Sequence, residues 1–461
     1  MDEFEQYSGK LIRTLQVRIT DVPGAFAKLA GVIGDTGALL GDISRLQITS
    51  HYVVRRVQVF VDDEAHLKRM IDGIAALDGV TLVSVDDEVM KIHEGGKLHS
   101  TSRVRLDSIG ALRMVYTPGV AQVCRAIQDE PGLARKYTTI GNSVAVLTNG
   151  TAVLGLGDIG VLAGMPVMEG KCVIMDEMVG ISASPILVDT HDPKALIEAA
   201  TLIAPTFGAI NLEDIAAPEC FDVETTLRAR LKTPVFHDDQ HGTAVVTIAA
   251  MISALKTVGR RMEDTSVVIN GAGAAGIAIA KMLMEFGVGD VVLCDRIGAI
   301  YKGRASHMNP YKEEIARLSN REGSRGDLAR TMAGKHVFIG VSGPGLVTSE
   351  MVKSMAKGPV VLALANPVPE ISPKAALAAG AAVAADGRSV NNALGFPGIF
   401  RGALDSAATA ISDEMTKAAA LTLAGLAADG ELMPDFLDRS VHRHVADAVA
   451  EAARKSGVAR A

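Results

Sequence analysis

The sequence is poor in cysteine, with four cysteines among 461 residues and no Cys-x-x-Cys pair. The four residues are spread widely along the chain, as Cys124, Cys172, Cys220 and Cys294. Isolated cysteines are typical of proteins in a reducing compartment, whereas small secreted domains pair theirs in disulfides. We therefore expect free thiols and a cytoplasmic protein.

Long apolar runs and an apolar leader are also missing. The chain begins with the acidic stretch Met-Asp-Glu-Phe-Glu, which is unlike the charged-then-apolar pattern of a signal peptide. Charges or prolines interrupt each Ala- and Val-rich run before it reaches the roughly 20 residues that a membrane helix needs. These absences predict no membrane partner.

An excess of positive charge is absent as well. The net charge is −7 and the isoelectric point is near 5.9, and the basic residues are dispersed along the chain. This gives no reason to expect nucleic acid as a partner. The chain is too long for one ordinary core, and its 48% hydrophobic residues are enough for two or three domains.

The strongest motif lies in the second half of the chain. A β-branched run, Val267 to Ile269, leads into Gly271-x-Gly273-x-x-Gly276 and then into an apolar helix. In this pattern the glycines permit a tight turn, close approach to a pyrophosphate, and close packing of helix on strand. A second apolar run ends at Asp295, where an acid is needed to hold a ribose diol. The pattern predicts a Rossmann-like dinucleotide domain.

The first 94 residues have the pattern of a separate small domain. Alternating apolar residues predict strands over 11–19, 43–48, 52–61 and 80–85, with helices over 25–33 and 63–77. The order βαββαβ is the ferredoxin-like plan. The turn Asp21-Val-Pro-Gly24 after the first strand resembles that of an ACT domain, in which this loop helps to bind a small molecule, often an amino acid. A purely structural or dimerising module is the equal alternative.

The polar, glycine-containing stretch 88–101 is interpreted as a linker. Residues 95–257, which begin within this stretch, are predicted to form an α/β substrate domain. Asn149-Gly150 between two strand-like runs is a hairpin signal. Two acid pairs follow short apolar runs, Glu213-Asp214 and Asp238-Asp239. Strand ends are where open α/β sheets place their chemistry.

Three of these acids are candidate metal ligands. Glu213, Asp214 and Asp239 offer the oxygen ligands that Mg²⁺ and Mn²⁺ prefer. His237 and His241 raise zinc as an alternative. A His-x-x-x-His pair must converge on one helix face to bind zinc, and the intervening Asp-Asp-Gln is interpreted as a loop, so zinc is disfavoured.

Several long motifs occur together and in one order. The chain resembles a malic enzyme of the small bacterial type, from about residue 95 to the C-terminal region, with an added N-terminal ACT domain. The motifs that carry the resemblance are Tyr116-Thr-Pro-Gly, Gly155-Leu-Gly-Asp, Glu169-Gly-Lys171, Asn211-Leu-Glu-Asp, His237-Asp-Asp-Gln-His-Gly-Thr-Ala, Gly271-Ala-Gly-Ala-Ala-Gly, Ala365-Asn-Pro and Asn391-Asn392.

The resemblance implies oxidative decarboxylation of L-malate to pyruvate and CO₂, with reduction of NAD. Lys171 would be the general base, Tyr116 the general acid, and Asp238 the partner of Lys171. Substrate contacts would come from Asn366, Asn391 and Asn392, while the cofactor contacts would be Gly271, Gly273, Ala274, Ala275, Gly276, Asp295, Arg296, Ser342 and Asn366. The family also implies that residues 393–461 pack back on the substrate domain, leaving 258–392 as the dinucleotide domain.

The chain departs from the commonest pattern of the family at a few places. Asp176 and Ile181-Ser182 replace a lysine and an Ile-Asp pair, the segment around Thr151-Ala152 lacks an arginine, and the stretch before Asn391 is short. These departures put the shape of the substrate pocket in doubt. Asp295 favours NAD because a carboxylate repels a 2′-phosphate, whereas Arg296 offers a pairing group for NADP.

Three functional hypotheses therefore stand. The first is the NAD-dependent malic enzyme reaction, and the second is a malolactic variant that releases lactate. The third is a catalytically silent sensor of a metabolite bound at the ACT domain. Because ACT domains usually pair, we expect a homodimer or a higher homo-oligomer.

Overall fold

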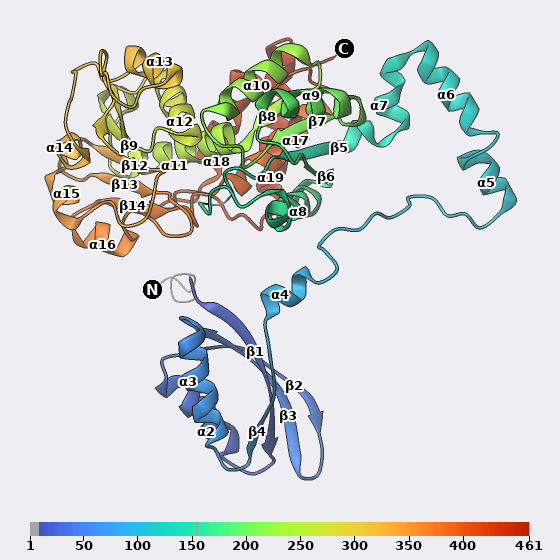
Figure 1. Ribbon diagram of the computed structural model, residues 1–461, viewed down its shortest axis with the longest axis vertical. Coiled ribbons are helices and arrows are strands. Elements are labelled where there is room, and N and C mark those ends of the chain that lie inside the picture. The colour runs from blue at the N-terminus through green and yellow to red at the C-terminus, as the bar shows by residue number, and fades with distance from the viewer. Residues whose placement is uncertain (1–8, 154, 461) are drawn as a thin grey trace. The chain divides into compact units, whose positions relative to one another are not determined.

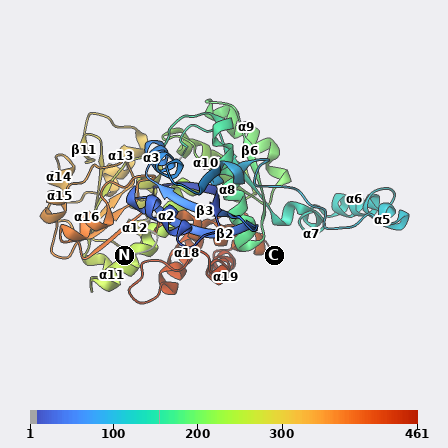
Figure 2. The ribbon, with the colours of Figure 1, turned by 90° about the horizontal axis from the view of Figure 1, so that it is seen from below.

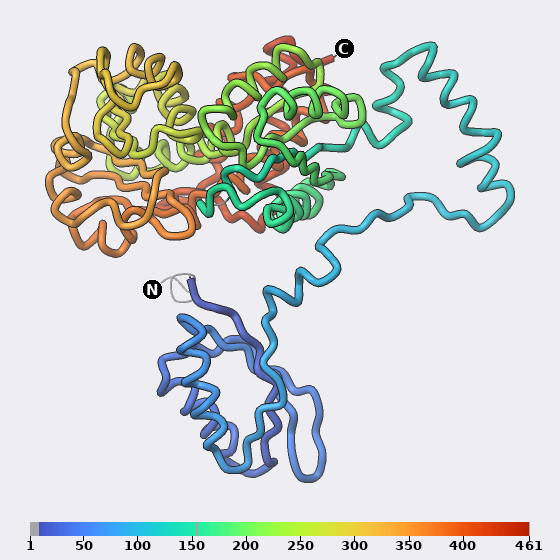
Figure 3. The backbone as a smooth tube through the Cα atoms, viewed as in Figure 1, coloured from blue at the N-terminus to red at the C-terminus, as the bar shows by residue number. Residues whose placement is uncertain are grey.

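The computed structural model describes residues 9–153 and 155–460. The chain divides into two compact units, Met1–His99 and Ser100–Ala461, which are treated separately below. Figure 3 traces the chain through both units in a single colour ramp.

The first unit contains a four-stranded antiparallel sheet, in the order β2-β3-β1-β4, against which α2 and α3 pack. Leu15 and Val17 of the sheet pack with Leu29 and Met70 of the helices in one core. This is the ferredoxin-like βαββαβ order predicted from apolar alternation. The elements are β1 Leu11–Thr20, α2 Ala25–Asp35, β2 Leu39–Ile48, β3 Tyr52–Val61, α3 Glu64–Ala75 and β4 Val80–Asp86.

The segment after the first sheet is partly helical. The predicted linker contains the short helix α4, Glu88–His93, which begins after Asp87, whose side chain accepts a hydrogen bond from the amide of Met90. Three short helices follow at the start of the second unit, and no residue in them is buried. They are α5 Ile109–Val115, α6 Val120–Asp129 and α7 Ala134–Tyr137.

The second unit contains a fully parallel sheet of four strands in the order β6-β5-β7-β8. Its central strand β5 is buried along its whole length, as expected for a parallel strand covered on both faces. The elements are β5 Ser143–Thr148, α8 Val161–Val179, β6 Ser182–Leu187, α9 Pro193–Ile203, β7 Ala209–Leu212, α10 Glu219–Arg230, β8 Val235–His237 and α11 Thr243–Thr257.

The hairpin predicted at Asn149-Gly150 is wrong. β5 pairs in parallel with both β6 and β7, so both edges of this strand are already occupied. After Thr148 the chain instead forms a loop that is closed by a short bridge between Val153 and Gly157. The two-residue turn signal was overridden by the long-range ladder of the sheet.

A second sheet follows, in the order β11-β10-β9-β12-β13-β14, and all its strands except the short β11 run parallel. This is the predicted Rossmann-like sheet, in which successive strands are added on one side of β9 and then, from β12, on its other side. The elements are β9 Ser266–Asn270, α12 Ala274–Glu285, β10 Asp290–Asp295, β11 Gly298–Ala299, α13 Pro310–Leu318, α14 Leu328–Met332, β12 Val337–Gly340, α15 Ser349–Ser354, β13 Val360–Ala363, α16 Pro373–Ala378 and β14 Val383–Asp386.

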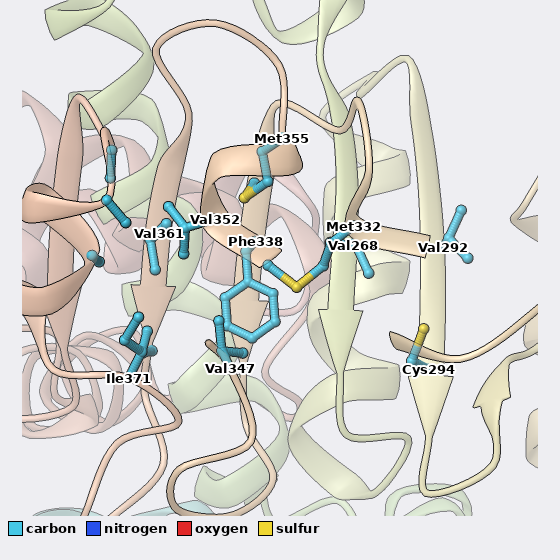
Figure 4. Packing of buried hydrophobic residues seen from close by; sticks show 14 of the residues in the cluster. Val268, Val292, Cys294, Met332, Phe338, Val347, Val352, Met355, Val361 and Ile371 are labelled. Atoms are coloured by element: carbon cyan, nitrogen blue, oxygen red, sulfur yellow. The ribbon is translucent and has the colours of Figure 1, made fainter. Parts of the chain in front are cut away.

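One face of this sheet is covered by a continuous apolar core. Phe338 of β12 lies between Met332 on one side and Val352 and Val361 on the other (Figure 4). Burying one apolar side chain as large as Phe338 contributes about 2–3 kcal/mol to the free energy of folding. This core therefore fixes the positions of the strands, and with them the positions of the loops that follow the strands.

The chain then returns to the first parallel sheet. Helices α17 (Phe396–Asp405) and α19 (Arg439–Lys455) contact α8, and α17 also contacts β7. α18 (Asp413–Leu426) packs on α11. Figure 1 shows these red helices beside the green elements of the smaller sheet, and in Figure 2 the yellow and orange dinucleotide elements again form a separate group.

The structure bears on the predictions made for the cysteines and for membrane-spanning segments. All four cysteines are free thiols, as predicted. Burial raises the pKa of Cys172 and of Cys294 to about 12, so these thiols are unreactive. Among the described residues, no helix combines the length and the apolar character needed to cross a membrane.

Candidate active site

The two acid pairs meet at one edge of the smaller parallel sheet. Glu213 and Asp214 follow β7, and Asp239 follows the neighbouring strand β8. Because adjacent parallel strands end at the same edge, the three side chains converge. One oxygen from each lies within 4.8 Å of the others.

These carboxylates are held by hydrogen bonds from the backbone and from an amide side chain. The amide of Asp214 donates to Asp239 Oδ2 at 2.8 Å, and Asn211 Nδ2 donates to Glu213 Oε2 at 2.8 Å. Asp214 adopts a left-handed backbone conformation with φ of 53°, which costs a non-glycine residue free energy and is found at functional sites. Burial and three neighbouring carboxylates raise the pKa of Glu213.

This donor set fits a hard divalent cation. It consists of three converging carboxylates, and hard cations such as Mg²⁺ and Mn²⁺ prefer oxygen ligands. A concentration of negative charge in a buried place also favours a bound cation over an empty site. We conclude that Glu213, Asp214 and Asp239 are suited to hold Mg²⁺ or Mn²⁺.

Zinc fits the arrangement less well. The segment Asp238–Gly242 is a single helical turn of π type, so the loop predicted there is wrong. His241 points away from the carboxylates, because its Nε2 bonds Glu224 Oε2 at 2.9 Å, whereas His237 Nδ1 lies 3.7 Å from Asp239 Oδ2. His237 is fully buried, and burial lowers its pKa. Neither histidine belongs to the described group of converging ligands.

Lys171 lies beside the carboxylates. It is carried by α8, a helix that starts after Gly160 and ends at a left-handed Gly180. Its ammonium forms an ion pair with Asp238 and lies 3.1 Å from Glu213 Oε1. The nitrogen also sits 4.4 Å from the ring centre of Phe396, a favourable cation–π position.

The neighbouring carboxylates dominate the electrostatics of Lys171. Burial lowers its pKa, but the charges of Asp238, Glu213 and Asp239 outweigh burial, so the pKa of Lys171 rises above its ordinary value. The lowered pKa expected for a general base therefore does not come from burial alone. A lowered pKa would require a positive charge that neutralises the neighbouring carboxylates.

The paired asparagines have different positions. Asn392 Nδ2 donates to Asp238 Oδ2 at 2.7 Å, which places Asn392 against the base and its partner. Asn391 instead accepts from the amide of Ala393 at 2.9 Å and donates to the carbonyl of Gly387 at 3.3 Å. In this structure Asn391 therefore stabilises the turn that presents Asn392.

The glycine motif adopts the geometry that dinucleotide binding requires. A side chain at Gly276 would place its Cβ 1.7 Å from the carbonyl oxygen of Gly271, and one at Gly271 would meet the carbonyl of Val341 at 2.5 Å. No atom lies within 4 Å of the corresponding position at Gly273, so its backbone is open to a ligand. Helix α12 begins immediately afterwards with Ala274 and Ala275, and its first amides are available to an anion.

A cavity of about 490 Å³ opens beside this motif. The residues that line it come from the ends of β9, β10 and β12 and from the stretch before and at the start of α13, and they include Asn270, Gly271, Asp295, Arg296, His307, Met308, Lys312, Ser342 and Leu346. The predicted cofactor residues Asp295, Arg296 and Ser342 thus lie around one cavity with the glycine motif.

Asp295 is already well bonded. Its Oδ1 accepts from the amide of Ile297 at 3.0 Å, and its Oδ2 accepts from Arg304 and from Lys312. Burial raises its pKa, but these bonds outweigh burial and hold the pKa at about 2. Arg296 points to His307, with 3.0 Å between Nη2 and Nδ1. The Asp295 carboxylate thus lies near three basic side chains, those of Arg296, Arg304 and Lys312.

Asn366 lies where the two sheets of the second unit approach each other. Its peptide bond to Pro367 is cis. A Cβ at Gly387 would lie 2.7 Å from its side-chain nitrogen, and a Cβ at Gly155 would lie 2.7 Å from its carbonyl oxygen. The glycine loop after β5 and the loop after β13 therefore meet at this residue.

Tyr116 is not brought to this site. It follows α5, and its side chain is 68% exposed, so it lies outside the buried group around Lys171. The candidate effector residues are also in an open turn, because Asp21 and Gly24 are both exposed and Gly24 precedes α2 with φ of 85°.

Sequence reasoning missed several residues of the cofactor cavity. Lys312 and Arg304 contact Asp295, and His307 lies next to Arg296. Glu370 bonds Ser342. No local pattern in the stretch Gly298 to Arg304, which follows Asp295, indicates that Arg304 turns back toward that acid.

Comparisons with known proteins show which family the chain resembles over most of its length. Residues 99–196 match the family model of the malic enzyme N-terminal domain, and residues 240–454 match that of the malic enzyme NAD binding domain. The chain is 46% identical to NAD-dependent malic enzyme 1 of Bacillus subtilis, across 96% of this chain and 98% of that protein. It is 45% identical to the NAD-dependent malic enzyme of Geobacillus stearothermophilus, across 95% and 93%.

Solved structures show the same likeness. A malic enzyme from Pyrococcus horikoshii superposes with a TM-score of 0.78 at 40% identity, covering 81% of this chain and 91% of that one. The NAD-dependent malic enzyme from Thermotoga maritima gives 0.76 at 41% identity, covering 78% and 98%. With both family domains matched and near-complete relatives at this level of identity, the chain belongs to the malic enzyme family.

Proposed function

We propose that the protein catalyses the oxidative decarboxylation of L-malate to pyruvate and CO₂, with NAD as the oxidant. The observation that carries this proposal is the pairing of Lys171 with Asp238 beside three converging carboxylates, where the turn Asp238–Gly242 packs against α12 of the glycine motif. A base, a cation site and a dinucleotide site are what this reaction needs.

Bound Mg²⁺ or Mn²⁺ would supply Lewis-acid stabilisation of negative charge on the substrate oxygens, and bound NAD would accept hydride. Lys171 takes the proton of the C2 hydroxyl, and Asp238 orients the resulting ammonium. Asn392 fixes Asp238 and lies close enough to face the substrate. After CO₂ leaves, Tyr116 donates a proton to C3 of enolpyruvate.

The proposed role of Tyr116 requires this side chain to reach Lys171. The helices α5 and α6 that flank it expose the apolar residues Ile109, Leu112, Met114, Val115 and Val120. An apolar surface of this kind indicates an interface. We propose that the protein works as a homo-oligomer and that these helices are covered in the assembly. A monomer at micromolar concentration by analytical ultracentrifugation would contradict this proposal.

NAD is proposed in preference to NADP because the Asp295 carboxylate lies in the cofactor cavity. The cations around it leave some capacity for a 2′-phosphate, and relatives of both kinds exist. The chain is 46% identical to the NADP-dependent malic enzyme of Haemophilus influenzae, across 79% of this chain and 51% of that protein. The two dehydrogenase cofactors must therefore be compared directly.

The N-terminal unit is proposed to be an ACT-type regulatory domain. Its support is the βαββαβ order and the turn that contains Asp21 and Gly24. A small-molecule effector would bind at this turn and alter malate turnover, in a cytoplasmic enzyme. Identical kinetics after replacement of Gly24 by valine, in the presence of each common amino acid, would contradict the proposal.

The first experiment is an initial-rate assay at the absorbance band of NADH. L-malate and Mn²⁺ are supplied with NAD, then with NADP, each with and without EDTA. Metal-dependent NADH formation with pyruvate as product supports the proposal. One relative, 49% identical across 82% of this chain and 95% of that protein, is a bifunctional malic/malolactic enzyme of Bacillus subtilis. Lactate without net NADH would favour that variant, and no product would favour a silent sensor.

A further inference from the structure

Glu370 is a fully buried acid in the part of the chain that carries the dinucleotide sheet. It lies between β13 and α16 and forms no ion pair with any residue in the described ranges. A buried carboxylate without a cation is costly unless hydrogen bonds satisfy both of its oxygens. The hydrogen bonds that Glu370 accepts therefore indicate the role of an acid at this position.

Both oxygens of Glu370 accept hydrogen bonds from loops at the cofactor cavity. Oε1 accepts from the amide of Ser342 at 2.9 Å and from its hydroxyl at 3.2 Å. Oε2 accepts from the amide of Ala365 at 3.2 Å. Ser342 Oγ in turn accepts from Asn270 Nδ2 at 2.7 Å. One carboxylate therefore links the segments that follow β12 and β13 directly, and the end of β9 through Ser342.

The sequence makes room for this carboxylate. A Cβ at Gly340, the last residue of β12, would lie 2.3 Å from Glu370 Cδ and within 2.6 Å of both oxygens. Any other residue at Gly340 would push the acid out of its place. The carboxylate thus fits a space that only glycine leaves open.

The residues that Glu370 bonds, directly or through Ser342, lie at the proposed cofactor cavity. Asn270 and Ser342 line the 490 Å³ cavity, and Ala365 directly precedes Asn366. We propose that Glu370 is a positioning residue for the dinucleotide, which acts through Ser342 and the Ala365–Asn366 segment without touching the cofactor. This inference rests on the proposed use of NAD and adds a residue to that same site.

The test is the variant Glu370→Gln, which keeps the size of the side chain but turns an amide group toward N–H and O–H donors. We expect the Kd for NADH, measured by fluorescence titration without malate or metal, to rise about tenfold or more. The KM for NAD should rise in parallel, and the KM for malate at saturating NAD should change less than about twofold. Glu350→Gln makes the same chemical change at an exposed position of α15 and should leave all three constants unchanged.

A double-mutant cycle tests the geometry independently. Gly340→Ala should weaken NADH binding in the wild-type background, because its new Cβ displaces the carboxylate. In a Glu370→Ala background the same glycine substitution should have little further effect. Equal effects in both backgrounds would overturn the inference.

Other outcomes are equally decisive. Should Glu370→Gln fail to fold, Glu370→Asp keeps the charge but shortens its reach to the amides of Ser342 and Ala365, and it must still weaken NADH binding. NADH affinity within twofold of wild type in a folded Glu370→Gln variant, or an equal loss for malate, overturns the positioning role. Failure of the wild-type protein to bind NADH would refute the proposed function and this inference together.

Discussion

Asn392 donates a 2.7 Å hydrogen bond to the same Asp238 oxygen that pairs with Lys171, although 154 residues separate Asn392 from Asp238. Asp238 is thus shared between the candidate base and the segment that returns from the dinucleotide sheet. The orientation of the base therefore depends on both halves of the second unit.

Replacing Lys171 by alanine should lower kcat for malate oxidation by roughly 10²–10⁴-fold, the usual contribution of a general base. NADH affinity should stay near that of the wild type, because Lys171 lies on α8, outside the cofactor cavity. Lys194→Ala, at an exposed position of α9, is the matched control and should retain full activity. Unchanged malate turnover in the Lys171 variant would exclude it as the base.

Adding Mn²⁺ at about 100 times its Kd should stabilise the wild-type protein by about 2.7 kcal/mol and raise its melting temperature by a few degrees. Asp239→Asn removes a charged ligand and should abolish this increase. Glu198→Gln, at an exposed position, should preserve it. An equal increase in the Asp239 variant and in the wild type would place the metal elsewhere.

Replacing Asp295 by serine should raise the ratio of kcat/KM for NADP to that for NAD by about tenfold or more. The variant removes the charge that repels a 2′-phosphate and frees Lys312 and Arg304 from their carboxylate partner. Steady-state kinetics with both cofactors measure the ratio. A ratio equal to that of the wild type would show that Asp295 does not select the cofactor.

Asp295 should also contribute to the acid sensitivity of the fold. Its pKa is about 2 in the folded protein against an ordinary value of 3.8, so the unfolded chain binds its proton more readily. The stabilisation is present above about pH 4 and is lost as the pH falls toward 2. The difference in melting temperature between wild type and Asp295→Asn should therefore shrink over this range. A difference independent of pH would refute the assignment.

Gly276→Ala should destabilise the protein by about 2 kcal/mol or more and abolish NADH binding, because its Cβ would lie 1.7 Å from a carbonyl oxygen. Gly425→Ala is the matched control, since no atom lies within 4 Å of its Cβ position in α18. This control should be neutral or stabilising by up to about 1 kcal/mol. Equal melting temperatures for the two variants would contradict the close helix–strand packing.

The sequence alone predicts the structure correctly where the informative pattern lies within a few consecutive residues. The strand β3, Tyr52–Val61, has the predicted bounds, because alternating apolar residues identify a strand with one buried face directly. The glycine motif was also interpreted correctly, since the close contact of Gly276 with Gly271 is a property of six consecutive residues.

Long-range contacts explain what could not be predicted. The turn at Asn149 has the composition of a hairpin, but the parallel neighbours of β5 decide its course. No spacing indicates that Arg304 returns to Asp295, or that Glu370 lies under Gly340. Likewise the motif around Tyr116 predicts its role from the resemblance, whereas its 68% exposure could be seen only in the structure.

The return of the C-terminal helices to the first parallel sheet means that the chain passes between the two sheets twice, through α11 and through the segment before α17. Two covalent crossings limit sliding of the halves past each other, so an opening between them would be a hinge rotation about these connections. Because Asn392 lies in the second connection, that rotation would change its distance to Asp238. Cofactor entry and the alignment of the base would then be mechanically coupled.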